Sequence, residues 1–266
     1  MAFTCTRYGI WLGNILTFDF GQSFTYDQPV MDVIVSKMPV SIQFGVISFF
    51  MTYLVCIPLG ILKAIRDGTA FDYMSSIILF LMWSIPGFML AILLIVFFGG
   101  GSFFDLIPIG GLYSDSYQDL GLWSKLWDRI HHFIAPLICY MIAEFTTLTL
   151  LMKNSIIEEI SKDYCRTARA KGLSRKTVYM KHALRNALIP IATGIGGFLG
   201  IFFAGSMLLE MIFNLDGMGL LGYTSVLARD FNVIMGDLVI ISLIALIGNI
   251  ISDFIYTIAD PRIDFV

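Results

Sequence analysis

The sequence predicts an all-α fold, a polytopic bundle of membrane-spanning helices. The chain is 57% hydrophobic and 14% charged, with a mean hydropathy of +0.81, whereas soluble domains carry about 25% charged residues. Several uncharged runs reach the roughly 20 residues that a helix needs to cross the hydrocarbon core. Nine of the 17 Lys and Arg residues lie in one stretch, residues 153–186, which must therefore lie in water.

We expect five spans, at residues 42–62, 74–98, 132–152, 187–209 and 234–258. Before them, residues 8–20 are apolar but short and contain Asp19, which favours an interfacial or packed helix over a span. The Gly- and aromatic-rich segment 99–131 is expected to fold over the outer mouth of the bundle.

The distribution of positive charge predicts an N-out, C-in topology. With residue 1 outside, the inner segments hold twelve Lys and Arg and the outer segments hold five, and basic residues favour the cytoplasmic side. This makes residues 1–41 an outer N-terminal segment, although no export signal is visible in them. Residues 42–266 form the membrane domain, with a cytoplasmic loop at 153–186. The net charge of −3, with the basic residues gathered in one loop, argues against nucleic-acid binding.

Two kinds of cofactor site are not expected. The four cysteines, Cys5, Cys56, Cys139 and Cys165, have no metal-ligand spacing, so we predict neither a metal site nor a disulfide. The glycine run at 99–101 follows no strand and precedes no Lys-Ser/Thr pair, so it is not a phosphate-binding loop.

Four residues are candidates for a translocation path: Pro86, Glu144, Gly196 and Gly200. Pro86 interrupts the second span, as Pro190 does the fourth, and such kinks either shape a path or are tolerated bends in a packed bundle. Gly196 and Gly200 have the small-xxx-small spacing of a close helix contact.

Two carboxylates within the predicted spans have alternative interpretations. Glu144 lies midway along the third span and either contacts the path or bonds to Thr146, Thr147, Thr149 or a neighbouring backbone; the second is slightly favoured. Asp253, near the inner end of the fifth span, is expected to pair with an inner basic group.

The basic loop is expected to form a helix, a sharp turn and a second helix. Ser155 and Glu158 have capping-box spacing, Gly172 is a helix stop, and Ser174 is a candidate N-cap. Ile156, Ile160 and Tyr164, with Ile157 and Ala168 beside them, give one apolar face. Small residues keep the turn slim, and its basic residues can pair with acids on a partner. The alternative is an ordinary positive-inside loop.

Residues 164–174 and 182–190 resemble the cytoplasmic signature of ABC importer permeases, in particular the oligopeptide/dipeptide branch of the binding-protein-dependent family. Residues 210–222, 260–264 and 18–23 resemble other segments of peptide permeases. The Lys153-Asn154-Ser155 start of the loop and the Ile-Asp-Phe ending look closest to the B subunit of the Yej type.

The resemblance implies a permease subunit of a bacterial inner (cytoplasmic) membrane importer that passes oligopeptides by alternating access. Its partners would be a second permease, an ABC ATPase that binds the ATP, an extracytoplasmic peptide-binding protein and lipid. The chain itself would not be an enzyme. The implied ATPase-coupling residues are Tyr164, Arg166, Thr167, Ala168, Arg169, Ala170, Lys171, Gly172 and Leu173.

Three features depart from the general family pattern. Arg166 replaces a Glu, and Pro190 lies farther from Gly172; both are usual in the peptide branch. The family also begins with a cytoplasmic N-terminus and a first span that we expect to be absent here, so that six spans become five.

Two competing functions belong to other classes. One is a secondary transporter or channel that uses Glu144 and Asp253 for ion coupling and needs no ATPase. The other is a membrane assembly factor without transport activity.

Overall fold

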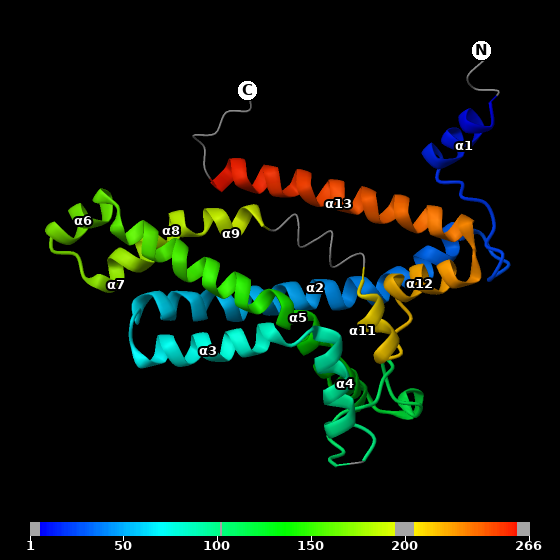
Figure 1. The fold of residues 1–266 in the computed structure, drawn as a ribbon, viewed down its shortest axis with the longest axis horizontal. Coiled ribbons are helices and arrows are strands. Elements are labelled where there is room, and N and C mark those ends of the chain that lie inside the picture. The colour runs from blue at the N-terminus through cyan, green and yellow to red at the C-terminus, as the bar shows by residue number, and fades with distance from the viewer. Residues whose placement is uncertain (1–5, 102, 195–204, 260–266) are drawn as a thin grey trace. The chain divides into compact units, whose positions relative to one another are not determined.

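The fold is helical throughout the part of the chain described by the computed structural model, residues 6–101, 103–194 and 205–259. Figure 1 shows the helices in chain order. They are α1 (Arg7–Leu16), α2 (Val30–Ile65), α3 (Ala70–Ser84), α4 (Gly87–Phe98), a 3-10 turn (Tyr117–Asp119), α5 (Leu122–Ser161), α6 (Asp163–Ala170), α7 (Arg175–Thr177), a π-helical segment (Val178–Ala183), α8 (Leu184–Ala187), α9 (Ile189–Thr193), α11 (Met207–Ile212), α12 (Met218–Ala228) and α13 (Phe231–Ala259). These residues include two isolated bridges but no strand.

The long apolar helices agree with the predicted spans in being helical, apolar and long enough to cross a membrane. By length and composition, α2 and α13 are each able to cross a membrane. The bent pair α3–α4 and the bent helix α5 would each supply one further span if both halves of the bend are counted together. In the most apolar 18-residue stretch of each helix, only 28% of α2 and 17% of α13 is buried inside the protein. Their outward apolar side chains therefore suit contact with lipid rather than water. Four of the five predicted spans have helical counterparts, and the remaining one, 187–209, runs into residues outside the described part.

Two helices begin well before the predicted spans that they contain. Helix α2 begins at Val30 and contains the span 42–62, and α5 begins at Leu122 and contains the span 132–152. Asp32 and Lys37 interrupt the hydropathy of the first extra segment, yet Val30, Val33 and Ile34 have helical spacing and are buried. The predicted outer segment 1–41 thus includes the first turns of a long helix. The short apolar segment near the N-terminus is helix α1, as expected.

Pro86 breaks the second span, as predicted. Helix α3 ends at Ser84, and the Pro86 carbonyl accepts the first hydrogen bonds of α4 from Met89 and Leu90. The two helices are bent by 92°. Since proline has no N–H and disfavours the helical conformation of the preceding residue, the break falls at the position its chemistry requires. Pro190 lies in the first turn of the short helix α9, where a missing N–H is tolerated.

The chain divides into two compact units, each assembled from three stretches of sequence. The first contains Met1–Val46, Ala91–Pro136 and Leu199–Ile247. Its core consists of side chains from the start of α2, from α12 and from α13: Val30, Val33, Ile34, Met218, Leu221, Val233 and Ile240. The second unit contains Ile47–Leu90, Leu137–Phe198 and Gly248–Val266.

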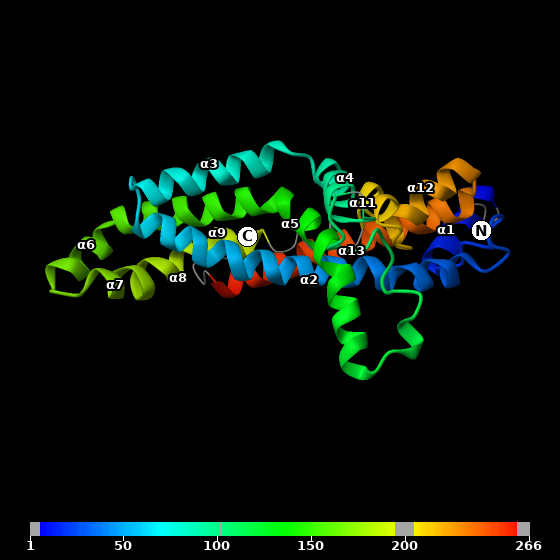
Figure 2. The same ribbon diagram turned by 90° about the horizontal axis from the view of Figure 1, so that it is seen from below.

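The second unit carries the basic loop. Its core combines the end of α2, the second half of α5 and helices α8 and α9, through Cys56, Ala64, Leu148, Met152, Ile156, Ala187 and Ile191. In both views, α3 and the second half of α5 run beside the end of α2, and α6 and α7 form a turn at one end of this unit (Figures 1 and 2). This arrangement presents the loop beyond the apolar helices.

Candidate functional site: the basic loop and its anchors

The first helix of the basic loop is the end of α5. Helix α5 continues without interruption through Ser155 to Ser161, so the predicted capping box at Ser155 and Glu158 is wrong. Ser155 is buried inside the helix and precedes the fully buried Ile156. Packing of this apolar face keeps the chain helical past a residue that would suit a helix start. The break comes instead at Lys162, which has extended backbone angles.

The sharp turn at Gly172 is a Schellman motif. Helix α6 ends at Ala170, and Gly172 has φ +82°, which glycine adopts without strain. The Gly172 N–H donates to the Arg169 carbonyl at 2.9 Å, and the Leu173 N–H donates to the Ala168 carbonyl at 3.3 Å. These are the two bonds that define the motif, so the predicted helix stop is confirmed.

The second helix begins at the predicted cap. The Ser174 hydroxyl accepts a hydrogen bond from the Thr177 N–H at 3.3 Å. Residues 178–183 then form π-helical turns before α8. The loop is therefore a helical hairpin: at its turn, the first arm ends in the Schellman motif and the second arm begins at the Ser174 cap.

A small apolar core holds the two arms of the hairpin together. Cys165 and Ala168 of α6 are buried against Val178 and Ala183 of the π-helical segment, and Ile160 packs against them. Ala168 therefore faces the inside of the hairpin and is not available to a partner. A substitution of Ala168 by a charged residue would disturb the loop itself, which makes it a poor test of partner binding.

The other predicted coupling residues are exposed. These are Tyr164, Arg166, Thr167, Arg169, Ala170, Lys171, Gly172 and Leu173. Arg169 lies in the last turn of α6 and Lys171 is its C-cap, where cations are favoured by the negative end of the helix dipole. The surface around the Gly172 turn is thus basic and narrow, with Leu173 as its exposed apolar side chain.

A polar network ties the hairpin to the helices that carry it. The carboxylate of Glu159 accepts from Lys162 and from the Tyr164 hydroxyl, and the Asn186 side chain donates to that hydroxyl at 3.1 Å. Burial and the bond to Glu159 raise the pKa of Tyr164, and the bond to Glu159 raises the pKa of Lys162. The network connects the end of α5, the start of α6 and α8.

The candidates for a translocation path fall only partly within the described residues. Glu144 is half-buried on α5, and Pro86 is exposed at the α3–α4 break. The hydroxyls of Thr146 and Thr149 donate to the carbonyls of Leu79 and Phe145, so these two do not donate to Glu144. Gly196 and Gly200 lie outside the described residues. Asp253 is exposed and has no ion pair among the residues described.

A buried carboxylate, Glu210, organises part of the first unit, and it begins the segment 210–222, which the sequence singled out only by resemblance. Glu210 accepts from the Ser41 hydroxyl and from the Leu220 N–H, both at 2.8 Å. The Ser41 oxygen also accepts from the Met218 N–H at 2.8 Å. Helix α12 starts after Gly217, which has no side chain to cap it, so Ser41 and Glu210 cap it from elsewhere in the chain.

The glycines near Glu210 leave room for its carboxylate. A Cβ atom on Gly217 would lie 2.6 Å from the Glu210 side chain. Burial raises the pKa of Glu210, although the hydrogen bonds from Leu220 and Ser41 oppose this effect. The sequence, which shows one Glu among scattered glycines, hardly indicates the contact between Glu210 and Ser41, since the two residues are 169 positions apart.

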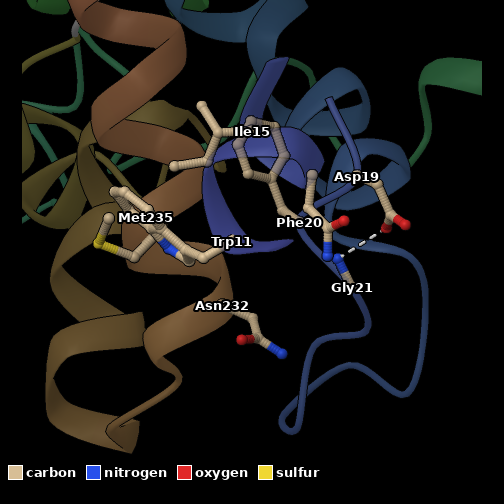
Figure 3. A pocket seen from close by; sticks show the side chains of 8 residues that line it. Trp11, Ile15, Asp19, Phe20, Gly21, Asn232 and Met235 are labelled. Atoms are coloured by element: carbon tan, nitrogen blue, oxygen red, sulfur yellow. Dashed lines mark hydrogen bonds between the residues drawn. The ribbon is translucent and has the colours of Figure 1, made fainter. Parts of the chain in front are cut away.

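The first unit also contains a cavity of about 250 Å³ between α1 and the start of α13 (Figure 3). It is lined by Trp11, Asn14, Ile15, Asp19, Phe20, Gly21, Asn232 and Met235. Two of its polar groups are already used: Asp19 accepts from the Gly21 N–H at 3.1 Å, and Asn232 donates to the Gln22 carbonyl at 2.7 Å. The cavity therefore marks loose packing of α1 rather than a built ligand site.

Comparison with known proteins defines the class. Residues 56–265 match the family of binding-protein-dependent transport system inner membrane components, and the chain belongs to this family. It is a multi-pass inner-membrane transport component rather than an enzyme.

The relatives narrow the class further. The chain is 47% identical to the peptidoglycan transport system permease protein YejB of Agrobacterium fabrum, over 98% of this chain and 72% of that protein. It is 45% identical to the inner membrane ABC transporter permease protein YejB of Escherichia coli, over 97% and 71%. It is 34% identical to the oligopeptide transport system permease protein AppB of Bacillus subtilis, over 97% and 80%. The predicted resemblance to Yej-type and oligopeptide permeases is confirmed.

The fold has a counterpart among solved structures. A chain of the MetNI methionine ABC transporter matches with a TM-score of 0.60 at 18% identity, over 85% of this chain and 97% of that chain. At this identity the match concerns the fold alone.

Proposed function

We propose that this chain is a permease subunit of an ATP-driven importer, and that its substrates are oligopeptides or peptide-bearing fragments of peptidoglycan. Family membership and the transport functions for which the YejB and AppB relatives are named support this substrate class. ATP is bound and hydrolysed by a separate ATPase, a second permease completes the membrane pathway, and an extracytoplasmic binding protein delivers the peptide.

The observation that carries the proposal is the exposed basic turn from Tyr164 to Leu173. It is stiffened by the Schellman motif and by its own apolar core, so it can transmit force without collapsing. Arg166, Arg169 and Lys171 project a positive surface that suits an acidic groove on an ATPase. A loop that only obeyed the positive-inside rule would need neither the buried core nor the closed hairpin.

A charge reversal with a matched control tests this proposal. The chain is reconstituted with its ATPase, second permease and binding protein, and ATP-dependent uptake of a labelled oligopeptide and a labelled peptidoglycan fragment is measured. Arg169→Glu reverses a charge on the proposed surface, and Lys176→Glu makes the same change on an exposed residue of α7. We expect about a tenfold loss of uptake and weaker ATPase co-purification for Arg169→Glu only.

Two results would contradict the proposal. One is uptake driven by an ion gradient in the absence of the ATPase, which is the behaviour of a secondary transporter. The other is normal ATPase binding and uptake in Arg169→Glu. Uptake of one labelled substrate and not the other would decide between the two substrate classes.

A further inference from the structure

Four alternating charges join α2, α3 and α5 at the residue where the basic loop begins. The Lys63 Nζ lies 3.0 Å from Asp72 Oδ1, and the Lys153 Nζ lies 2.7 Å from Asp72 Oδ2. Lys153 also lies 2.8 Å from Asp67 Oδ1. The two cations and two anions compensate one another, as a partly buried group of charges requires.

The Lys63 ammonium is completely buried and fully occupied. It donates to the Asp72 carbonyl at 2.9 Å, to the Ser75 hydroxyl at 2.7 Å and to the Ser76 hydroxyl at 2.8 Å. Because these acceptors use its three protons, the contact with Asp72 Oδ1 is electrostatic and not a hydrogen bond. The end of α2 is therefore fixed to the first two turns of α3.

Lys153 connects this pair to the loop. It is the first residue of the 153–186 stretch, and it bridges the buried Asp72 and the half-exposed Asp67. Its neighbour Met152 packs against Gly60 of α2 so closely that a Cβ on Gly60 would lie 2.6 Å from the Met152 Cβ. The end of α5 thus cannot slide along α2 without breaking both the packing and the ion pairs.

We infer that Lys153, Asp72 and Lys63 are positioning residues that carry a displacement of the basic loop to the α2–α3 hairpin. This inference rests on the proposed function. Apolar side chains tolerate small shifts at little cost, whereas charge-assisted hydrogen bonds in a water-poor site hold their partners at fixed distances. The network therefore keeps α5, α2 and α3 in register when an ATPase moves the loop.

The test measures peptide transported per ATP hydrolysed in proteoliposomes that contain the complete transporter. Lys153→Gln removes the link, Lys153→Arg keeps the charge, and Lys176→Gln removes a lysine elsewhere in the loop. We expect the ratio to fall about tenfold for Lys153→Gln, a typical size for a lost coupling between sites. Lys153→Arg should retain most of the ratio, and Lys176→Gln should equal the unmodified protein.

The controls separate this inference from the proposed function. ATP-driven uptake by the unmodified protein tests the function, and its failure would leave no ratio to compare. A Lys153→Gln complex that assembles, unfolds at a lower temperature and keeps its ratio would show a purely structural role and overturn the inference. If Lys153→Gln does not assemble, Asp72→Asn decides, because it removes the charge that links the two lysines while the Asp72 carbonyl and the Ser75 and Ser76 hydroxyls still accept from Lys63. An unchanged ratio in Asp72→Asn would then overturn the inference.

Discussion

At the scale of single residues, burial separates positions that look alike in sequence. Ala168 and Ala170 are both small residues of α6, yet Ala168 is 6% exposed and Ala170 faces solvent. The same distinction applies to the lysines, since Lys63 is completely buried while those near the Gly172 turn are exposed. A role assigned to a residue from its type must therefore be checked against the direction of its side chain.

Ala168→Glu should open the basic hairpin, and Ala170→Glu should not. A carboxylate at position 168 would displace Val178 and Ala183 or be buried without a partner, at a cost of about 2–4 kcal/mol in local stability. At position 170 the change should stay within about 0.5 kcal/mol. Trypsin cleavage rates within the loop of the purified protein measure the difference. Equal rates in the two variants would contradict the buried position of Ala168.

Asp230 makes the first unit sensitive to acid. Burial alone would raise its pKa, but hydrogen bonds from the Ser23 hydroxyl at 2.6 Å and the Thr25 N–H at 3.1 Å outweigh burial and hold the pKa below its usual range. A depressed folded pKa gives stability that is complete above the unfolded value, about 3.9, and is lost as pH falls through the folded value.

Acidification should therefore loosen the 18–30 segment in the unmodified protein. The protection of amides in this segment against hydrogen exchange, taken relative to the intrinsic rate at each pH, is expected to decrease as the pH falls below about 4. Asp230→Asn should exchange faster at neutral pH and show no such step. The same acid step in both proteins would mean that another group is responsible.

At the scale of elements, close helix contacts depend on glycines whose role is steric. Gly60 lies opposite Met152 and Thr149. A Cβ atom added to Gly60 would lie 2.6 Å from the Met152 Cβ and 2.8 Å from the Thr149 carbonyl oxygen. A Cβ atom added to Gly13 of α1 would have no other atom within 4 Å among the described residues, apart from its chain neighbours and helix backbone. Both glycines are inside helices, so the intrinsic preference of the helix for alanine is the same at the two sites.

Gly60→Ala should destabilise the protein, and Gly13→Ala should not. Overpacking costs about 1–3 kcal/mol, which exceeds the helix-propensity gain of about 1 kcal/mol. At position 13 only the gain remains. Thermal unfolding in detergent tests both variants, and an unchanged or higher unfolding temperature for Gly60→Ala would show that α2 and α5 are not in close contact at this point.

Element boundaries show where sequence reasoning succeeds and where it fails. The break at Pro86, the stop at Gly172 and the cap at Ser174 follow from local chemistry and were predictable. The starts of α2 and α5 and the continuity of α5 through Ser155 were not. These depend on packing against segments distant in the sequence, which a local pattern of charges and caps does not contain.

At the scale of the whole molecule, the N-out, C-in topology remains a prediction. Its test uses variants without the native cysteines, with one new cysteine at Ser116 or at Ser174, both of which are exposed. In intact spheroplasts, a membrane-impermeant maleimide should label Ser116→Cys. Ser174→Cys should react only after the membrane is permeabilised. The reverse pattern would invert the topology and place the basic loop outside.

The class of this protein follows from its sequence alone: a helical inner-membrane permease component with a basic signature loop. Composition, charge distribution and short motifs can be read from the sequence without knowing which residues are in contact in the fold. Only the tertiary structure placed Ala168 inside the hairpin, paired Glu210 with Ser41, and joined Lys63, Asp72 and Lys153. These relations depend on which side chains meet after folding, and a buried charge looks the same in the sequence as an exposed one.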